Sequence, residues 1–185
     1  MKLSAFLFLA IIMFAASCKP KKHIGPNGVE YTSALQYNDY IIGKQKAVVM
    51  DMTNYGKAAQ INADSAEGLL NSTINNITHS LGDITGMPAY NGDSSFRDAA
   101  IELFSFYKKS FSTDFKEMLE INRKIEKDSY TDSDIERFKQ IEENIGRKES
   151  PLDAKLKDVQ TRFAKANKLT LNNPEVANQA DTLTQ

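Results

Sequence analysis

Apolar residues recur every three or four positions over most of the chain after residue 30, which is the spacing of one face of an α-helix. The strict alternation of apolar and polar residues that marks a half-buried strand is scarce. The first stripe lies in residues 30–60 and consists of Leu35, Asn38, Ile42, Gln45, Val49 and Met52, widened by Tyr37, Ile41, Val48 and Tyr55. This spacing predicts a long first helix with one face in the core.

Three further stripes follow with the same spacing. The second consists of Leu70, Ile74, Ile77, Leu81 and Ile84. The third consists of Phe96, Ala100, Leu103, Tyr107, Phe111, Phe115, Met118 and Ile125. The fourth consists of Ile135, Phe138, Ile141 and Ile145, and resumes as Leu152, Leu156, Val159 and Phe163. Each stripe predicts one helix that buries a single face.

Short polar signals separate these stripes and predict the helix starts. Ser or Thr followed three residues later by Asp resembles a capping box, with Asp in place of the usual Glu. The expected caps are Asn62 or Asp64, Ser95 with Asp98, and Thr131 with Asp134. Ser150-Pro151 lies inside the fourth stripe and predicts a kink or a break there.

Long helices joined by short loops pack best against antiparallel neighbours. We therefore predict an all-α fold for residues 30–169, built as an antiparallel up-down four-helix bundle. The alternative is an elongated helical hairpin that self-associates, because stripes of this length can also pair between chains. Residues 170–185 carry Pro174, many amides and no periodic face, which predicts a disordered tail.

The chain opens with an apolar run that is too short to span a bilayer, since a spanning helix needs about 20 residues. Lys2 precedes the run Leu3–Phe14, and Ala16 and Ser17 follow it. A positive start, an apolar centre and small residues at the end are typical of a secretory signal.

The single cysteine of the chain, Cys18, follows this run in "AASC". The stretch resembles the lipobox of bacterial lipoproteins, although Ala15 stands where that family more often has leucine. The resemblance implies that the chain is cut after Ser17 and that a diacylglyceryl group is attached to the Cys18 sulfur. Residues 1–17 are then a lipoprotein signal peptide and residues 18–29 a lipidated tether, in which "HIGPNG" disfavours regular structure.

The resemblance also bears on location. Residue 19 is Lys19 and not the aspartate that retains many proteobacterial lipoproteins in the inner membrane, which implies the outer membrane. Surface-exported lipoproteins carry acids just after the cysteine, whereas "KPKKH" has none. We therefore favour the periplasmic side over the cell surface.

A second resemblance extends over residues 30–169. The runs "YNDYIIGKQKAVV" and "LKDVQTRFAKANKL" are similar to the opening and closing helices of a family of helical surface lipoproteins of spirochaete and Bacteroidetes bacteria. This resemblance implies a helical envelope protein and adds no catalytic residue.

The residues offer little for catalysis or cofactor binding. One cysteine and the two histidines His23 and His79 are too few for a conventional zinc site, and neither histidine has a glutamate three residues before it, as helical di-iron sites require. Phosphate-loop, nucleophile-elbow and zinc-protease motifs are missing from the sequence. We expect no cofactor, no metal and no catalytic residue.

These observations predict a membrane-anchored, non-catalytic module that binds an envelope protein partner or has a structural role. A formal net charge of −1 does not suggest a nucleic-acid partner. The membrane lipid is contacted through acylated Cys18, and self-association is an open alternative. A small-ligand-binding bundle is the second hypothesis and an enzyme the last.

Two amides, Asn38 and Gln45, lie on the apolar seam of the first predicted helix. One hypothesis is that they pair across the bundle and fix its register, as a buried Asn does in coiled coils. The other is that they line a polar ligand pocket together with Tyr37 or Tyr40.

Overall fold

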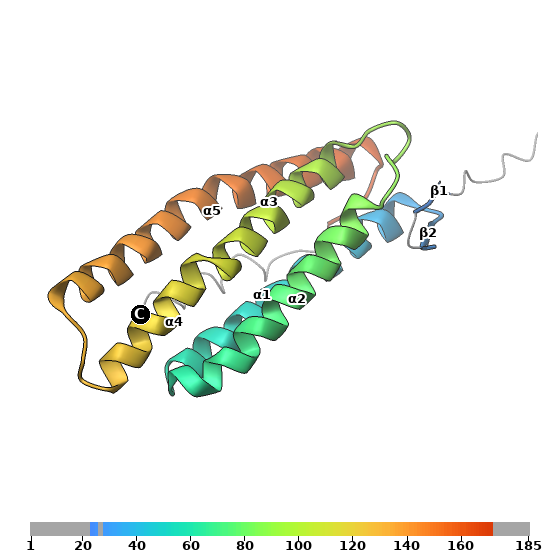
Figure 1. Ribbon diagram of the computed structural model, residues 1–185. Coiled ribbons are helices and arrows are strands. Elements are labelled where there is room, and N and C mark those ends of the chain that lie inside the picture. Colours follow the sequence, from blue (N-terminus) through green and yellow to red (C-terminus); the bar gives the residue numbers. More distant parts are fainter. Residues whose placement is uncertain (1–22, 26–27, 172–185) are drawn as a thin grey trace, which may run out of the picture.

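The structure is a computed structural model that describes residues 23–25 and 28–171, most of which are helical. The helices are α1 (Ala34–Ala59), α2 (Ala63–Thr85), α3 (Ser95–Ser112), α4 (Asp114–Glu126) and α5 (Asp132–Ala166). One small antiparallel sheet pairs β1 (His23–Ile24) with β2 (Glu30–Tyr31). The long helices lie lengthwise beside one another, and α4 extends the line of α3 (Figure 1). The predicted helical class is confirmed.

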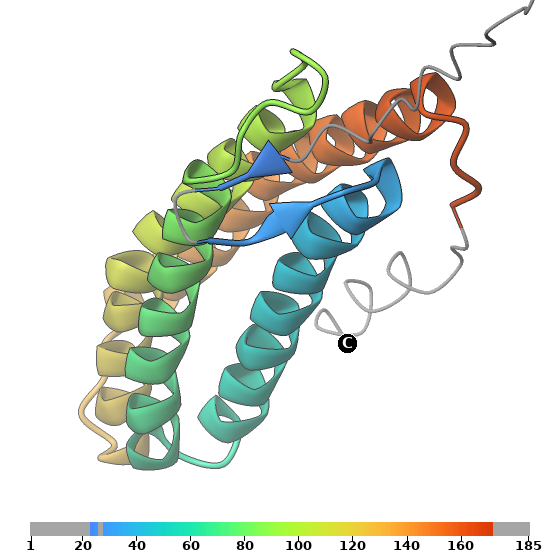
Figure 2. The same cartoon turned by 90° about the vertical axis from the view of Figure 1, so that its right-hand side faces the viewer.

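The sheet corrects the prediction that residues 23–28 lack regular structure. His23 pairs with Tyr31 and Ile24 with Glu30. Gly28, with φ +75°, adopts the left-handed conformation that the turn between the strands requires. Tyr31 is buried, and this hairpin lies across the end of the helices where α1 begins (Figure 2). Burial of an aromatic ring stabilises a short hairpin that the turn residues alone would leave marginal.

Local capping explains where two helices begin. Asn62 precedes α2 and its side chain accepts a hydrogen bond from the Ser65 amide at 2.7 Å, which confirms the first of the two expected caps. Thr131 and Asp134 form the predicted capping box of α5: Thr131 Oγ1 accepts from the Asp134 amide, and Asp134 Oδ2 accepts from the Thr131 amide.

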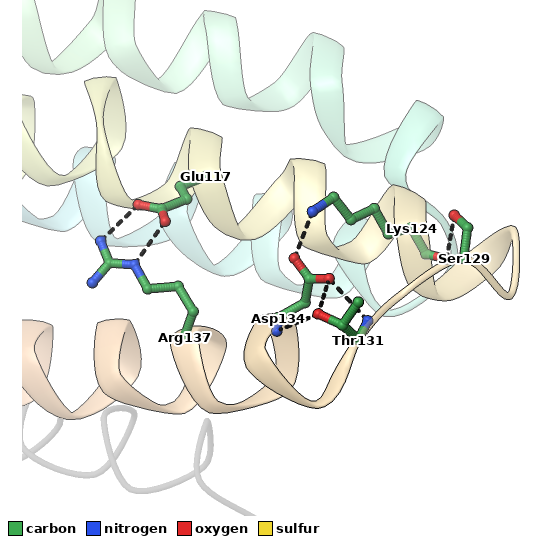
Figure 3. Close-up of polar contacts among 6 residues, drawn as sticks. All are labelled: Glu117, Lys124, Ser129, Thr131, Asp134 and Arg137. Carbon is green, nitrogen blue, oxygen red and sulfur yellow. Dashed lines mark hydrogen bonds and ion pairs between the residues drawn. The ribbon is translucent and has the colours of Figure 1, made fainter.

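Ion pairs hold α4 against the start of α5 (Figure 3). Glu117 on α4 accepts two hydrogen bonds from Arg137 on α5, at 2.7 and 2.8 Å. Lys124 donates to Asp134, and this contact together with the capping hydrogen bonds lowers the pKa of Asp134 to about 2. The turn between α4 and α5 is therefore fixed by side chains that also define the start of α5.

The third predicted helix is divided. Thr113, with φ −125° and ψ −69°, separates α3 from α4. The predicted Ser95–Asp98 capping box is wrong as well: Ser95 is already in the helix, its amide donates to Asp93 Oδ1, and Asp98 accepts from Ser94 Oγ. Two adjacent serines made the start ambiguous: the N-cap is Ser94, one residue before the predicted Ser95, and its side chain forms no capping hydrogen bond.

The fourth predicted helix is continuous, because α5 runs through Pro151 without a break. Proline at this position cannot donate to the carbonyl of Arg147, which disfavours a helix interior. Buried residues on both sides of it, Ile141 before and Leu156 after, pack against other helices and hold the two halves in one helix.

The core consists of two clusters. The larger one contains buried apolar residues of α1, α2, α3 and the second half of α5, together with Leu119 of α4. The smaller one joins α4 to the first half of α5 through Met118, Ile121 and Ile141. Most stripe residues are buried or half-buried, but Leu35 and Ile125 are exposed, contrary to prediction. In α1 the buried face is centred on Tyr37, Ile41 and Val48, so Leu35 at the edge of the predicted stripe points outward.

Replacement of Thr131 by alanine tests the capping box. Thr131→Ala removes the hydroxyl that accepts from the Asp134 amide and donates to Asp134 Oδ2. We therefore expect the free energy of unfolding to fall by about 1 kcal/mol, measured by urea denaturation. Thr161→Ala is the control, because that exposed hydroxyl bonds only to the Lys157 carbonyl of its own helix. Equal stability of the two variants would contradict a capping role for Thr131.

Candidate functional site

The two predicted seam amides lie between α1 and α5. Asn38 and Gln45 are 6% and 7% exposed. Asn38 Oδ1 accepts a hydrogen bond from Gln160 Nε2 at 2.9 Å, and Gln45 Nε2 donates to Asp153 Oδ1 at 3.3 Å. The two bonds lie about two helical turns apart along the facing helices. Polar side chains thus connect α1 with α5 at two levels.

The burial of these amides follows from their position on α1. Both share the side of the helix that faces α5, next to the core residues Ile41 and Val48. Asn38 Nδ2 donates a second hydrogen bond to Asp39 Oδ1 at 3.0 Å. Buried amides are tolerated when their donors and acceptors are used, and this is the case for both functional groups of Asn38.

A third polar contact lies one helical turn before Asp153, on the α3 side of α5. Tyr107 OH on α3 donates to Glu149 Oε1 at 2.8 Å. Burial raises the pKa of Glu149; the Tyr107 hydrogen bond acts in the opposite direction and nearby Asp153 adds to the rise. Burial is also the main cause that raises the pKa of Tyr107, so this hydroxyl remains a donor. We call Asn38, Gln45, Glu149, Asp153 and Gln160, with Tyr107, the polar seam.

The structure separates the two predicted tyrosines from the polar seam. Tyr37 OH donates to the Pro88 carbonyl at 2.9 Å in the α2–α3 loop, and its ring stacks on Phe163. Burial raises its pKa. The Tyr40 ring lies edge-on to Tyr31, with centroids 5.4 Å apart, and under the ammonium of Lys44. These contacts give both tyrosines a packing role at the hairpin end of the molecule.

Sequence reasoning missed the α5 half of the polar seam. Glu149, Asp153 and Gln160 are spaced by four and seven residues, which places them on one side of a helix. The pattern was detectable, but charged residues on a helix usually face solvent. Only the three-dimensional packing of α5 near α1 and α3 reveals their contacts: Glu149 and Gln160 are half-buried, whereas Asp153 is exposed and reaches Gln45.

The predicted lipid attachment residue, Cys18, lies outside the described residues, as do the predicted signal peptide 1–17 and residues 172–185 of the predicted disordered tail. Of the two histidines, His23 lies with its ring tilted by 35° against Tyr90, with centroids 5.0 Å apart, and His79 is exposed. Within residues 23–25 and 28–171, no three His, Cys, Asp or Glu side chains are grouped so that they could hold a metal ion. None of the described helices combines the length and the apolar character needed to cross a membrane.

Comparison with known proteins found no match to the chain among protein-family models, curated proteins or solved structures.

A double-mutant cycle tests whether the Asn38–Gln160 contact joins the two helices. We expect Asn38→Ala and Gln160→Ala each to lower the free energy of unfolding by about 1 kcal/mol, with a coupling of about 0.5–1.5 kcal/mol between them. The control cycle combines Asn38→Ala with Gln140→Ala, an exposed position in the first half of α5, and should be additive. Additivity in both cycles would show that the amides do not act together.

Glu149→Gln tests the buried carboxyl. The pKa of Glu149 is raised in the folded protein, so the folded state holds the proton of this carboxyl more tightly than the unfolded state does. The protonated carboxyl therefore contributes stability below pH 4.5, and this contribution is lost as the pH rises through the folded pKa. The variant keeps an acceptor for Tyr107 and has no charge to bury. We expect it to be more stable than wild type at pH 7 and equally stable at pH 4, measured by urea denaturation.

Glu143→Gln, an exposed change on the same helix, is the matched control and should alter stability little at either pH. A Glu149→Gln variant less stable than wild type at pH 7 would mean that the ionised carboxylate is itself stabilising.

Proposed function

We propose that the chain is a bacterial envelope lipoprotein, held in the outer membrane by a diacylglyceryl group on Cys18, on the periplasmic side. Its folded part acts as a non-catalytic module that binds an envelope partner or has a structural role. One observation carries this proposal: the only cysteine of the chain directly follows an apolar run of signal-peptide length and two small residues.

The position of the hairpin supports such an anchor. Four residues lie between Cys18 and His23, and an extended chain covers at most about 17 Å over these five residue steps. His23 is held against the folded part, because its ring packs at a tilt against Tyr90 and the strand paired with it buries Tyr31. A lipid on Cys18 would therefore keep the hairpin end of the protein close to the membrane. With two acyl chains, release from the membrane would be negligible.

We further propose that the folded part is an antiparallel four-helix bundle in which α3 and α4 together form the third helix. The neighbouring pairs α1–α2, α2–α3 and α3–α5 support this architecture, and the polar seam supplies the contact between α1 and α5 that would close the bundle. The hairpin alternative, with α1 and α5 unpaired within one chain, is disfavoured by these seam contacts.

A non-catalytic module is preferred over a small-ligand-binding bundle because of the amides. In a ligand pocket Asn38 and Gln45 would be free to bind the ligand, whereas both bind side chains of α5. Their pairing favours a role in helix register. An enzyme remains the last alternative.

Labelling of cells with palmitate tests the anchor. We expect the wild-type chain to incorporate labelled palmitate and to remain with the membrane fraction, and Cys18→Ala to lose the label because it has no thiol to accept the lipid. Ser17→Ala is the matched control: it keeps a small residue before the cysteine and should still be labelled. A wild-type chain that is unlabelled and free in the soluble fraction would rule out the lipoprotein proposal.

A further inference from the structure

The outward side of α1 carries two large apolar side chains that none of the other described helices covers. Leu35 is 51% exposed and Met50 is 63% exposed. Asp39, Gly43 and Lys46 lie between them and are also exposed. The spacing of these five positions by three or four residues places them on one side of the helix. We call this set the outward α1 face.

The other sides of α1 are occupied. Lys44 forms an ion pair with Asp83 of α2 at 2.6 Å, and Gln45 bonds to α5 on the opposite side. Tyr55, on the side away from the outward α1 face, packs on Phe111. The outward α1 face therefore has α2 on one flank and α5 on the other, and nothing in the described part of the chain packs over it.

The charged residues of this face are available for a partner. Within the described residues, neither Asp39 nor Lys46 has an oppositely charged side chain within 4.0 Å, and the one hydrogen bond of Asp39 is accepted from its neighbour Asn38. One acid and one base without ion-pair partners thus lie between two exposed apolar residues.

The sequence of this face is self-complementary for antiparallel helices. Suppose that two antiparallel copies of α1 are related by a two-fold axis that passes between Ile42 and Gly43. Each residue before this point then faces the residue of the other copy that follows the point by the same number of positions. Leu35 of each copy then contacts Met50 of the other, and Asp39 contacts Lys46. We propose that the outward α1 face binds the same face of a second copy of this chain in this antiparallel register.

Gly43 suits the crossing point. It lies beside the two-fold axis, and a Cβ atom built at this position would have no other atom within 4 Å. A glycine at a helix crossing lets the two backbones approach closely because no side chain separates them. Ile42, half-buried beside it, would contact the backbone of the partner at Gly43.

A parallel pairing fits the same residues poorly. It would set Asp39 against Asp39 and Lys46 against Lys46, and like charges facing each other repel. The antiparallel register replaces both repulsions by two ion pairs that are identical by symmetry, as an isologous interface requires. One helix face is smaller than a standard protein interface, so the dimer is expected to be weak and to form at high protein concentration.

Cross-linking of introduced cysteines tests the register. The full chain with Cys18→Ala has no cysteine and is purified in detergent. Two variants of it, Leu35→Cys and Met50→Cys, then carry one thiol each. In the proposed dimer a thiol at position 35 meets the partner's thiol at position 50, whereas thiols at equal positions lie about 22 Å apart. A short thiol cross-linker should therefore couple the mixture of the two variants and neither variant alone. Ala154→Cys, exposed on α5, is the control that should stay uncoupled in every mixture.

Charge exchange gives an independent readout by sedimentation equilibrium. Asp39→Lys and Lys46→Asp each replace two ion pairs by two repulsive pairs in the homodimer, and each should weaken self-association about tenfold. An equimolar mixture of the two variants restores both ion pairs in the heterodimer and should associate as the wild type does. Asp39→Lys loses the hydrogen bond between Asn38 and Asp39, whereas Lys46→Asp keeps it. Circular dichroism therefore checks that the two variants are equally helical.

Three results would overturn the inference. The first is a Cys18→Ala chain that stays monomeric at its highest soluble concentration, together with a mixture of Leu35→Cys and Met50→Cys chains that stays uncoupled. The second is coupling of Leu35→Cys chains with one another, which indicates a parallel pair. The third is a mixture of the two charge variants that associates no better than either alone. Since the chains in the cross-linking test cannot be lipidated at Cys18, the outcome is independent of the anchor proposal.

Discussion

Aromatic packing around Phe163 is the contact on which the closure of the molecule depends. This ring near the end of α5 stacks on Tyr37 of α1, lies against Tyr90 of the α2–α3 loop, and contacts Phe96 at the start of α3. Phe163 is 4% exposed. Large aromatic rings bury more apolar area than other side chains do. The ring of Phe163 is therefore large enough to contact α1, the α2–α3 loop and α3 at once.

The remaining contact between α1 and α5 has a different chemistry. Away from Phe163 the two helices are connected by the polar seam, in which the long side chains of Gln45 and Gln160 reach across to Asp153 and Asn38. Such hydrogen bonds add modest net stability but are costly to break inside a protein. On the register hypothesis these bonds would select one register for α5 against α1, in addition to the aromatic contact of Phe163 with Tyr37.

The features that the sequence predicts well are those that depend on a few neighbouring residues. Asn62 and Thr131 cap helices because a short polar side chain there accepts a hydrogen bond from an amide three residues later. The burial of Asn38 also follows from periodicity alone, since it falls on the apolar side of α1. Helix positions and much of the core can be predicted on this basis.

The features that the sequence does not predict depend on distant parts of the chain. Pro151 disfavours a helix locally, yet buried residues before and after it keep α5 continuous. The hairpin forms because Tyr31 finds a buried site next to Tyr37, which no local signal encodes. Glu149 was missed because its environment is created by α3 and α5 together. Function is less predictable still: Cys18 is the basis of the proposed anchor, and none of the described residues identifies a partner.

The proposed anchor and the proposed antiparallel pair would together constrain the orientation of the protein. The lipid would hold the end of the molecule where α1 begins, and α1 is about 39 Å long. In an antiparallel pair the two hairpin ends point in opposite directions. Both anchors reach the same membrane only if the helices lie along its surface, because the short segment between Cys18 and His23 covers at most about 17 Å. Helices that stand upright on the membrane leave the second anchor far from that surface, so an upright pair requires two facing membranes.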